Sequence, residues 1–257
     1  SARIARWIAR IAPLGLLVSL CLGASDDKDP RWHVADASQR WLLSVTTPVH
    51  NETVARPLRV PADRLPATDG GALRAWDLQS DREVPIQTLG KELLLDPVAG
   101  LPGGSRRHYL LYHGPAASPI TSPATLQNER VVETDRYQAT IDLARGGILA
   151  SLVLKDGPRR IETLGDGLTW WIGRQNAIRP EQFANLTLER TADGPVFLGL
   201  AVQYRGVLDA ANSLRVDYRF FRDLVEVDYH YRAAKPVDMN WLKIPVSLRS
   251  TGTAAGL

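Results

Sequence analysis

Apolar and polar residues alternate along most of the chain, in short runs separated by glycine and proline. The 257 residues include 20 Gly and 17 Pro. Alternation with a period of two gives each strand one apolar and one polar face, and the period of a helix is almost absent beyond residue 24. The pattern predicts an antiparallel all-β protein with short strands.

The first block of strands occupies residues 30–114, and a segment rich in Pro, Ser and Ala follows it at 115–124. Its expected strands are 41–47, 58–60, 73–78, 84–89, 92–95 and 106–113. A polar turn at 79–82 is expected to bring 84–89 back antiparallel to 73–78. Pro85 cannot donate a ladder hydrogen bond, so its strand should lie at an edge or begin there. About 85 residues of this kind are typical of an immunoglobulin-like sandwich, and the Pro-rich segment of a semi-rigid linker.

The second block, residues 125–257, has longer alternating runs. Its expected strands are 137–143, 148–154, 196–204, 213–221, 224–232 and 242–248. Arg145-Gly146-Gly147 supplies residues that tolerate positive φ, so we expect a tight turn between the first two strands.

Strands 213–221 and 224–232 can pair across a two-residue turn, Arg222-Asp223. In that register one face is apolar, with Val216 opposite Tyr229, Tyr218 opposite Val227, and Phe220 opposite Val225. The other face is ionisable, with Arg219 opposite Glu226, Asp217 opposite Asp228, and Arg215 opposite His230. The hairpin is therefore predicted to have one core face and one solvent-exposed face.

Asp217 opposite Asp228 would place two like charges ~5 Å apart. A functional pair would contact a substrate or a cation, whereas a structural pair would be neutralised diagonally by Arg215 and Arg219. His230, on the same face, could remove the C5 proton of a uronic acid or a sugar hydroxyl proton, because imidazole titrates near neutral pH. It could equally be a solvated strand histidine. Arg232 completes this group of candidate residues.

Trp170-Trp171 is an unusual dipeptide followed by polar residues. Neighbouring strand residues point to opposite faces, so one indole could pack in a core while the other stacks on a sugar ring. Packing of both indoles in a core or interface is the alternative.

Residues 1–24, called the leader here, carry Arg3, Arg6 and Arg10 and no acidic residue. The whole chain has a net charge of +3, so the remainder is neutral. A basic start, a short apolar run and small residues near its end are typical of a secretory signal, and we expect export to the periplasm or the extracellular space. The alternatives are a lipid anchor on Cys21, an uncleaved membrane anchor and an organelle transit peptide.

The sequence argues against several classes of function. The sequence contains no P-loop, no G-x-S-x-G and no dinucleotide-binding fingerprint. A neutral chain without a basic stripe does not favour nucleic acid. The lone Cys excludes a disulfide framework and a multi-cysteine zinc site, the histidines lack metal-ligand spacing, and no metal or cofactor is expected.

Several stretches together resemble carbohydrate-active enzymes. Residues 81–87, 93–95 and 102–112 look like the small β-domain of large members of this group. Residues 133–143 with 145–152 and Lys155 look like the opening of a galactose-mutarotase-like β-super-sandwich, and 215–227 is similar to its later strands. This pattern occurs in exo-rhamnogalacturonan-lyase-like proteins and in the C-terminal sandwiches of retaining α-mannosidases.

The resemblance implies an immunoglobulin-like sandwich followed by an incomplete super-sandwich, in a fragment of a longer protein. We expect an exported part of a lyase that acts on a pectin-type polysaccharide, with its catalytic region missing here or lying downstream. In such an enzyme His230, Arg215 and Arg232 would be catalytic, and Trp170, Trp171, Asp217 and Asp228 would bind substrate. The expected partner is a polysaccharide or oligosaccharide, with membrane contact only through the leader. The alternatives are a non-catalytic carbohydrate-binding or scaffold module and a fragment of an α-mannosidase-type glycosidase.

Overall fold

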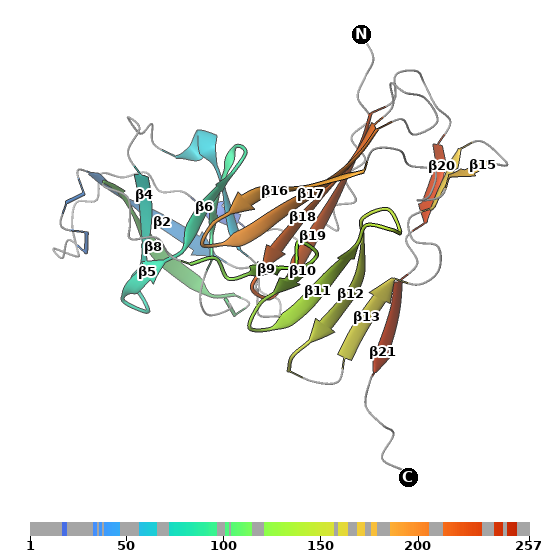
Figure 1. Cartoon of the computed structure of the whole chain (residues 1–257). Helices are drawn as coiled ribbons and strands as arrows, with labels where there is room; N and C mark the ends of the chain where they lie inside the picture. The colour runs from blue at the N-terminus through green and yellow to red at the C-terminus, as the bar shows by residue number, and fades with distance from the viewer. Residues whose placement is uncertain are drawn as a thin grey trace, which may run out of the picture. The chain divides into compact units, whose positions relative to one another are not determined.

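The chain forms antiparallel β-sheets, shown in Figure 1. The computed structural model describes residues 17–19, 33–34, 36–37, 39–46, 57–65, 72–96, 101–102, 104–114, 121–156, 159–163, 169–172, 176–178, 186–205, 213–232, 239–243 and 246–250. Within these ranges there is no α-helix, and the prediction of an all-β protein is confirmed. No helix in this part of the chain is long and apolar enough to cross a membrane. Most of the leader and residues 115–120 lie outside the described residues.

The chain divides into two compact units: the first contains residues 11–122 and 194–196, and the second contains residues 123–193 and 197–257. The first unit has a five-stranded sheet in the order β1-β2-β8-β4-β5 and a three-stranded sheet in the order β3-β7-β6. The first of these contains β1 (Leu17–Ser19), β2 (Gln39–Thr46), β8 (Arg106–Gly114), β4 (Ala72–Asp77) and β5 (Arg82–Val84). The second contains β3 (Leu58–Pro61), β7 (Glu92–Leu95) and β6 (Ile86–Leu89), and a 3₁₀ turn, η1 (Ala62–Arg64), follows β3. Buried side chains from both sheets form one core, including Leu43, Val45, Leu58, Leu95 and Tyr109.

Pro85 marks the point where the chain passes from one sheet to the other. The sequence predicts one strand at 84–89 that pairs with 73–78, and this prediction is wrong. β5 pairs with β4, whereas β6 pairs with β7 in the three-stranded sheet. Because Pro85 has no amide hydrogen, the ladder is interrupted there, and both β5 and β6 are edge strands as the proline requires.

Asp77 is a buried carboxylate at the end of β4. It accepts hydrogen bonds from the Ser80 hydroxyl at 2.8 Å and the Gln79 amide at 3.0 Å, and Arg107 Nε lies 3.2 Å from it. Burial, followed by the nearby Asp77 charge, raises the pKa of the Tyr109 hydroxyl to about 12. Asp77 therefore holds the turn that joins β4 to β5.

We expect Asp77→Ala to lower the free energy of unfolding by about 2–3 kcal/mol, because half-buried donors lose a charged acceptor. Urea denaturation measures the loss. Asp63→Ala, at an exposed position in η1, is the matched control and should cost less than ~0.5 kcal/mol. Equal costs for the two variants would contradict the role given to Asp77.

The second unit contains three sheets. A six-stranded sheet runs β21-β13-β12-β11-β10-β9, and its strands are β21 (Val246–Ser250), β13 (Arg159–Thr163), β12 (Ile148–Leu154), β11 (Tyr137–Asp142), β10 (Val131–Glu133) and β9 (Thr125–Gln127). A four-stranded sheet runs in chain order through β16 (Thr187–Asp193), β17 (Phe197–Arg205), β18 (Ser213–Phe221) and β19 (Val225–Arg232). A three-stranded sheet places β14 (Thr169–Ile172) between β15 (Asn176–Ile178) and β20 (Met239–Lys243).

One apolar core joins the six-stranded and four-stranded sheets of this unit. Ala139, Ile141 and Ile148 contribute from the first sheet, and Val202 and Tyr218 from the second. Two sheets that share one buried face in this way make a β-sandwich. The unit therefore has the layered β architecture that the alternation predicts.

The prediction of one strand at 242–248 is wrong for a reason similar to that for 84–89. The chain forms two strands here: β20 pairs with β14 in the three-stranded sheet, and β21 pairs with β13 at the edge of the six-stranded sheet. Pro245 falls between them in the sequence, and a proline cannot continue a ladder. This stretch of the sequence therefore contributes to two different sheets.

Candidate functional site

The β18–β19 hairpin carries most of the candidate residues, and its register is as predicted. Asp217 is opposite Asp228, and Arg215 is opposite His230. Val216, Tyr218 and Phe220 are buried in the core. Neither Arg222 nor Asp223 has a positive φ, so the turn is not one of the primed types that usually close two-residue hairpins. Alternation, rather than turn chemistry, identifies the register.

The first residue of β11 and the residues just before this strand hold the hairpin turn in place. The buried Tyr137 hydroxyl donates to the carbonyl oxygen of Phe221 at 2.6 Å, and the Thr134 hydroxyl donates to that of Arg222 at 3.2 Å. The Arg222 guanidinium binds the Asp135 carboxylate with contacts of 2.8 and 3.0 Å. These contacts join residues more than 80 positions apart in the chain. They therefore hold the turn of the hairpin against the start of β11.

The Asp135–Arg222 pair should make a pH-dependent contribution to stability. The hydrogen bond from Arg222 is the main reason that the pKa of Asp135 lies below its ordinary value. Its stabilisation is therefore present above the ordinary carboxyl pKa and is lost as the pH falls through the lowered one. We expect Arg222→Gln to cost ~0.5 kcal/mol at neutral pH, a small value because both side chains are partly exposed.

Urea denaturation of both proteins at neutral pH and in strong acid checks this expectation, since the difference should vanish in acid. Asp135→Asn is the matched variant and should behave in the same way. A cost that persists in strong acid would show that Arg222 acts through packing and not through its charge.

The outer face of the four-stranded sheet, defined as the side chains of β16–β19 that point away from the core, bears the ionisable groups. Arg215 Nε lies 2.8 Å from Asp217, and Arg219 lies 2.6 Å from Asp228 and 3.3 Å from Glu226. The two opposed aspartates are thus each neutralised by an arginine. For Asp228 the contact is diagonal, as the structural interpretation of the sequence predicts, whereas Asp217 is neutralised by an arginine on its own strand. The charge pattern makes their close approach tolerable.

His230 is a second partner of Asp217. Its Nε2 atom lies 3.1 Å from the Asp217 carboxylate, and half of its side chain is exposed. When Nε2–H donates to the carboxylate, Nδ1 carries the lone pair, so the ring can accept a proton from a molecule in solvent. Asp217 therefore orients a possible general base.

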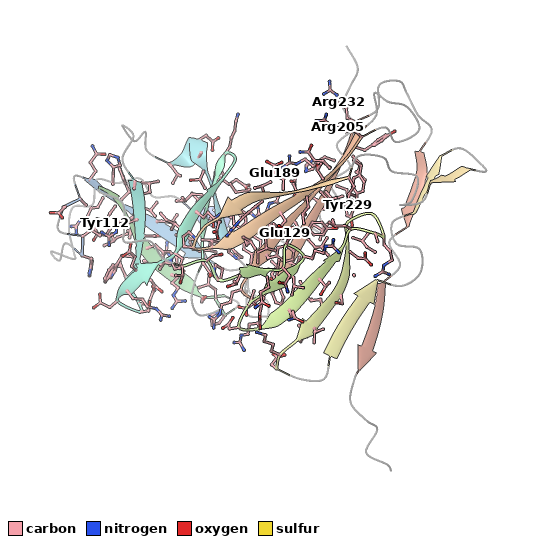
Figure 2. The ribbon with its side chains drawn as sticks, in the orientation of Figure 1. Tyr112, Glu129, Glu189, Arg205, Tyr229 and Arg232 are labelled. Carbon is pink, nitrogen blue, oxygen red and sulfur yellow. The ribbon has the colours of Figure 1, made fainter. Side chains whose placement is uncertain are left out.

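Arg232 lies two residues beyond His230 at the end of β19 and is exposed. The register places it opposite Ser213, and Ser213 opposite Arg205 of β17. Figure 2 shows Arg205 and Arg232 at the same end of this sheet. The sequence interpretation missed Arg205, because its expected strand stops at residue 204 and the pairing of β17 with β18 spans a long connection.

Trp170 and Trp171 do not belong to this face. They lie in the central strand of the three-stranded sheet, where Trp171 is the register partner of Trp241 and Trp170 that of Leu242 and Ile178. Their side chains lie outside the described residues, so the stacking hypothesis stays a prediction. The structure brings together His230, Arg215, Asp217 and Asp228 on one sheet face, with Arg232 at its end, but places the two tryptophans on another sheet.

Comparisons with known proteins do not identify a family for this chain. No protein-family model matches the chain, and searches of curated proteins and of solved structures gave no match either. Among the described residues, no group of three or more His, Cys, Asp or Glu side chains could hold a metal ion. What the site can do is therefore argued from its own residues.

Proposed function

We propose that the protein is an exported carbohydrate-active protein whose outer face binds a uronic-acid-containing, pectin-type polysaccharide and cleaves it by β-elimination. The observation that carries this proposal is the Asp217 carboxylate, which contacts both Arg215 and His230 on an exposed sheet face. The export signal and the resemblance to exo-rhamnogalacturonan-lyase-like proteins support the same function.

β-Elimination at a uronate needs a base and a cation. The base removes the C5 proton, the electrons of the C5–H bond form a C4–C5 double bond, and the C4–oxygen bond breaks. The leaving oxygen then takes a proton from water or from the protonated base. A cation beside the uronate carboxylate makes C5 more acidic, because it stabilises the negative charge that develops there.

The residues of the outer face match these two requirements. His230 Nδ1 is the proposed proton acceptor, and Asp217 positions the imidazole through Nε2. Arg232 is exposed at the strand end and is the cation that can meet a substrate carboxylate. Arg215 is already bound to Asp217 by Nε, so its role is to hold that carboxylate and leave its outer nitrogens toward the ligand.

The test is incubation of the full-length protein with rhamnogalacturonan, with ultraviolet absorbance as the measure of unsaturated uronate products. Absorbance should rise with time and with protein concentration. A polysaccharide whose carboxyl groups have been reduced to alcohols is the control and should give no signal. Absence of unsaturated product from the acidic polysaccharide would overturn the elimination mechanism.

A non-catalytic carbohydrate-binding module is the second candidate. It is favoured by the pairing of Asp217, Asp228 and Glu226 with arginines, which keeps these carboxylates as structural ions. Such a face would bind an acidic glycan without turnover. Binding of oligogalacturonate by the full-length protein, with the ligand recovered intact, would support this candidate over the lyase.

A further inference from the structure

At the end of the outer face where β17 and β19 terminate, the arginines are arranged differently from those on the rest of this face. Arg205, Ser213 and Arg232 occupy one row across three neighbouring strands, β17, β18 and β19. In the next row inward, Gln203 is opposite Arg215, which is opposite His230. The row of Arg205 and Arg232 is therefore adjacent to the candidate base.

Arginines elsewhere on this face are matched by acids, and those of the end row are not. Arg215 contacts Asp217, and Arg219 contacts Asp228 and Glu226. Arg205 and Arg232 are exposed, and within the described part of the chain neither makes an ion pair. Two like charges on one open row repel each other, and a bound anion would relieve that repulsion.

The spacing of the row suits one small oxyanion. Neighbouring strands lie ~5 Å apart, so the α-carbons of Arg205 and Arg232 are separated by ~10 Å across Ser213. Two long arginine side chains can converge over such a gap. A guanidinium binds a carboxylate with two parallel hydrogen bonds, and the Ser213 hydroxyl between them supplies a further donor.

We propose that Arg205 and Arg232 form a subsite for the carboxylate of an acidic sugar residue. This inference rests on the proposed function in one respect only, namely that the ligand is a glycan. Two residues along a strand span ~7 Å, which is close to the span of one sugar ring with its linkage. One uronate residue of the oligosaccharide can therefore place its carboxylate between the two arginines and its C5 proton toward His230, so that Arg232 is the same cation that the elimination needs.

The probe is trigalacturonate, titrated calorimetrically into the full-length protein in a His230→Ala background so that the ligand is not consumed. We expect Arg205→Gln and Arg232→Gln each to weaken binding about tenfold, and the double variant more strongly, because each removes a charged contact to the carboxylate. Binding should also weaken as salt is added. Arg205→Lys keeps the charge but not the bidentate geometry and should lie between wild type and Arg205→Gln.

Arg82→Gln is the matched control, since Arg82 is an exposed arginine on the edge strand β5 of the other unit and the net charge changes equally. It should bind within about twofold of the parent protein, because Arg82 belongs to neither row of the proposed subsite. Unchanged binding by both Arg205→Gln and Arg232→Gln, or equal binding of the carboxyl-reduced trisaccharide, would overturn the subsite. Failure of the lyase assay alone would leave it standing, because the titration needs no turnover.

Discussion

Gly147→Ala should lower the free energy of unfolding of the second unit by about 3–4 kcal/mol, which is the largest loss of stability that we expect from one substitution. Gly147 has a φ of +64° in the turn before β12, a conformation that costs an L-residue energy. A Cβ atom at this position would also lie 2.5 Å from Cγ1 of the buried Val202. Backbone strain and overpacking therefore add at one site.

Gly90→Ala separates the two effects. Gly90 has a similar φ of +59°, and a Cβ atom there would meet nothing within 4 Å. We expect it to cost only about 1 kcal/mol, the price of the left-handed conformation alone. Urea denaturation of both variants provides the comparison, and equal costs would show that β17 yields to the added methyl group.

His230→Ala should reduce the rate of unsaturated-product formation at least ~100-fold, because a positioned general base contributes this much or more to proton transfer. His230 is half exposed and lies outside the core, so the variant should fold and its urea denaturation should match the parent. The initial rate of absorbance increase with rhamnogalacturonan measures the effect.

Added imidazole distinguishes a lost base from a disturbed sheet. The exposed position left by His230 can admit free imidazole, and we expect it to restore part of the rate. Glu189→Gln is the control, since Glu189 is exposed on β16 and its removal changes the charge of the same face without touching Asp217 or His230. A rate that survives His230→Ala, or a loss that imidazole cannot restore, would contradict the proposed base.

Local features of the fold could be predicted from the sequence. Residues 213–220 and 225–232 alternate and are joined by a short turn, so only one register buries their apolar side chains on one face. The positive φ values of Gly146 and Gly147 were also predictable, because a tight turn between β11 and β12 requires residues that tolerate this conformation. Alternation and turn length together determine such a register.

Features that depend on distant segments could not be predicted. A proline lies within each of the runs 84–89 and 242–248, but nothing in either run shows that the residues on its two sides belong to different sheets. The row of Arg205 and Arg232 depends on how β17 pairs with β18, across a connection too long for its length to define a register. The contact of His230 with Asp217 was not foreseen either, because the predicted register places His230 opposite Arg215 and does not determine which diagonal neighbour a side chain contacts.

We propose that the outer face of β17, β18 and β19 is the functional surface. Chemical-shift mapping of the full-length protein, titrated with trigalacturonate in the His230→Ala background, is the decisive test. We expect shifts concentrated on the backbone amides around Gln203, Ser213, Arg215 and Arg232. Shifts confined to the first unit or to the β15-β14-β20 sheet that carries Trp170 and Trp171, or no shifts at all, would contradict it.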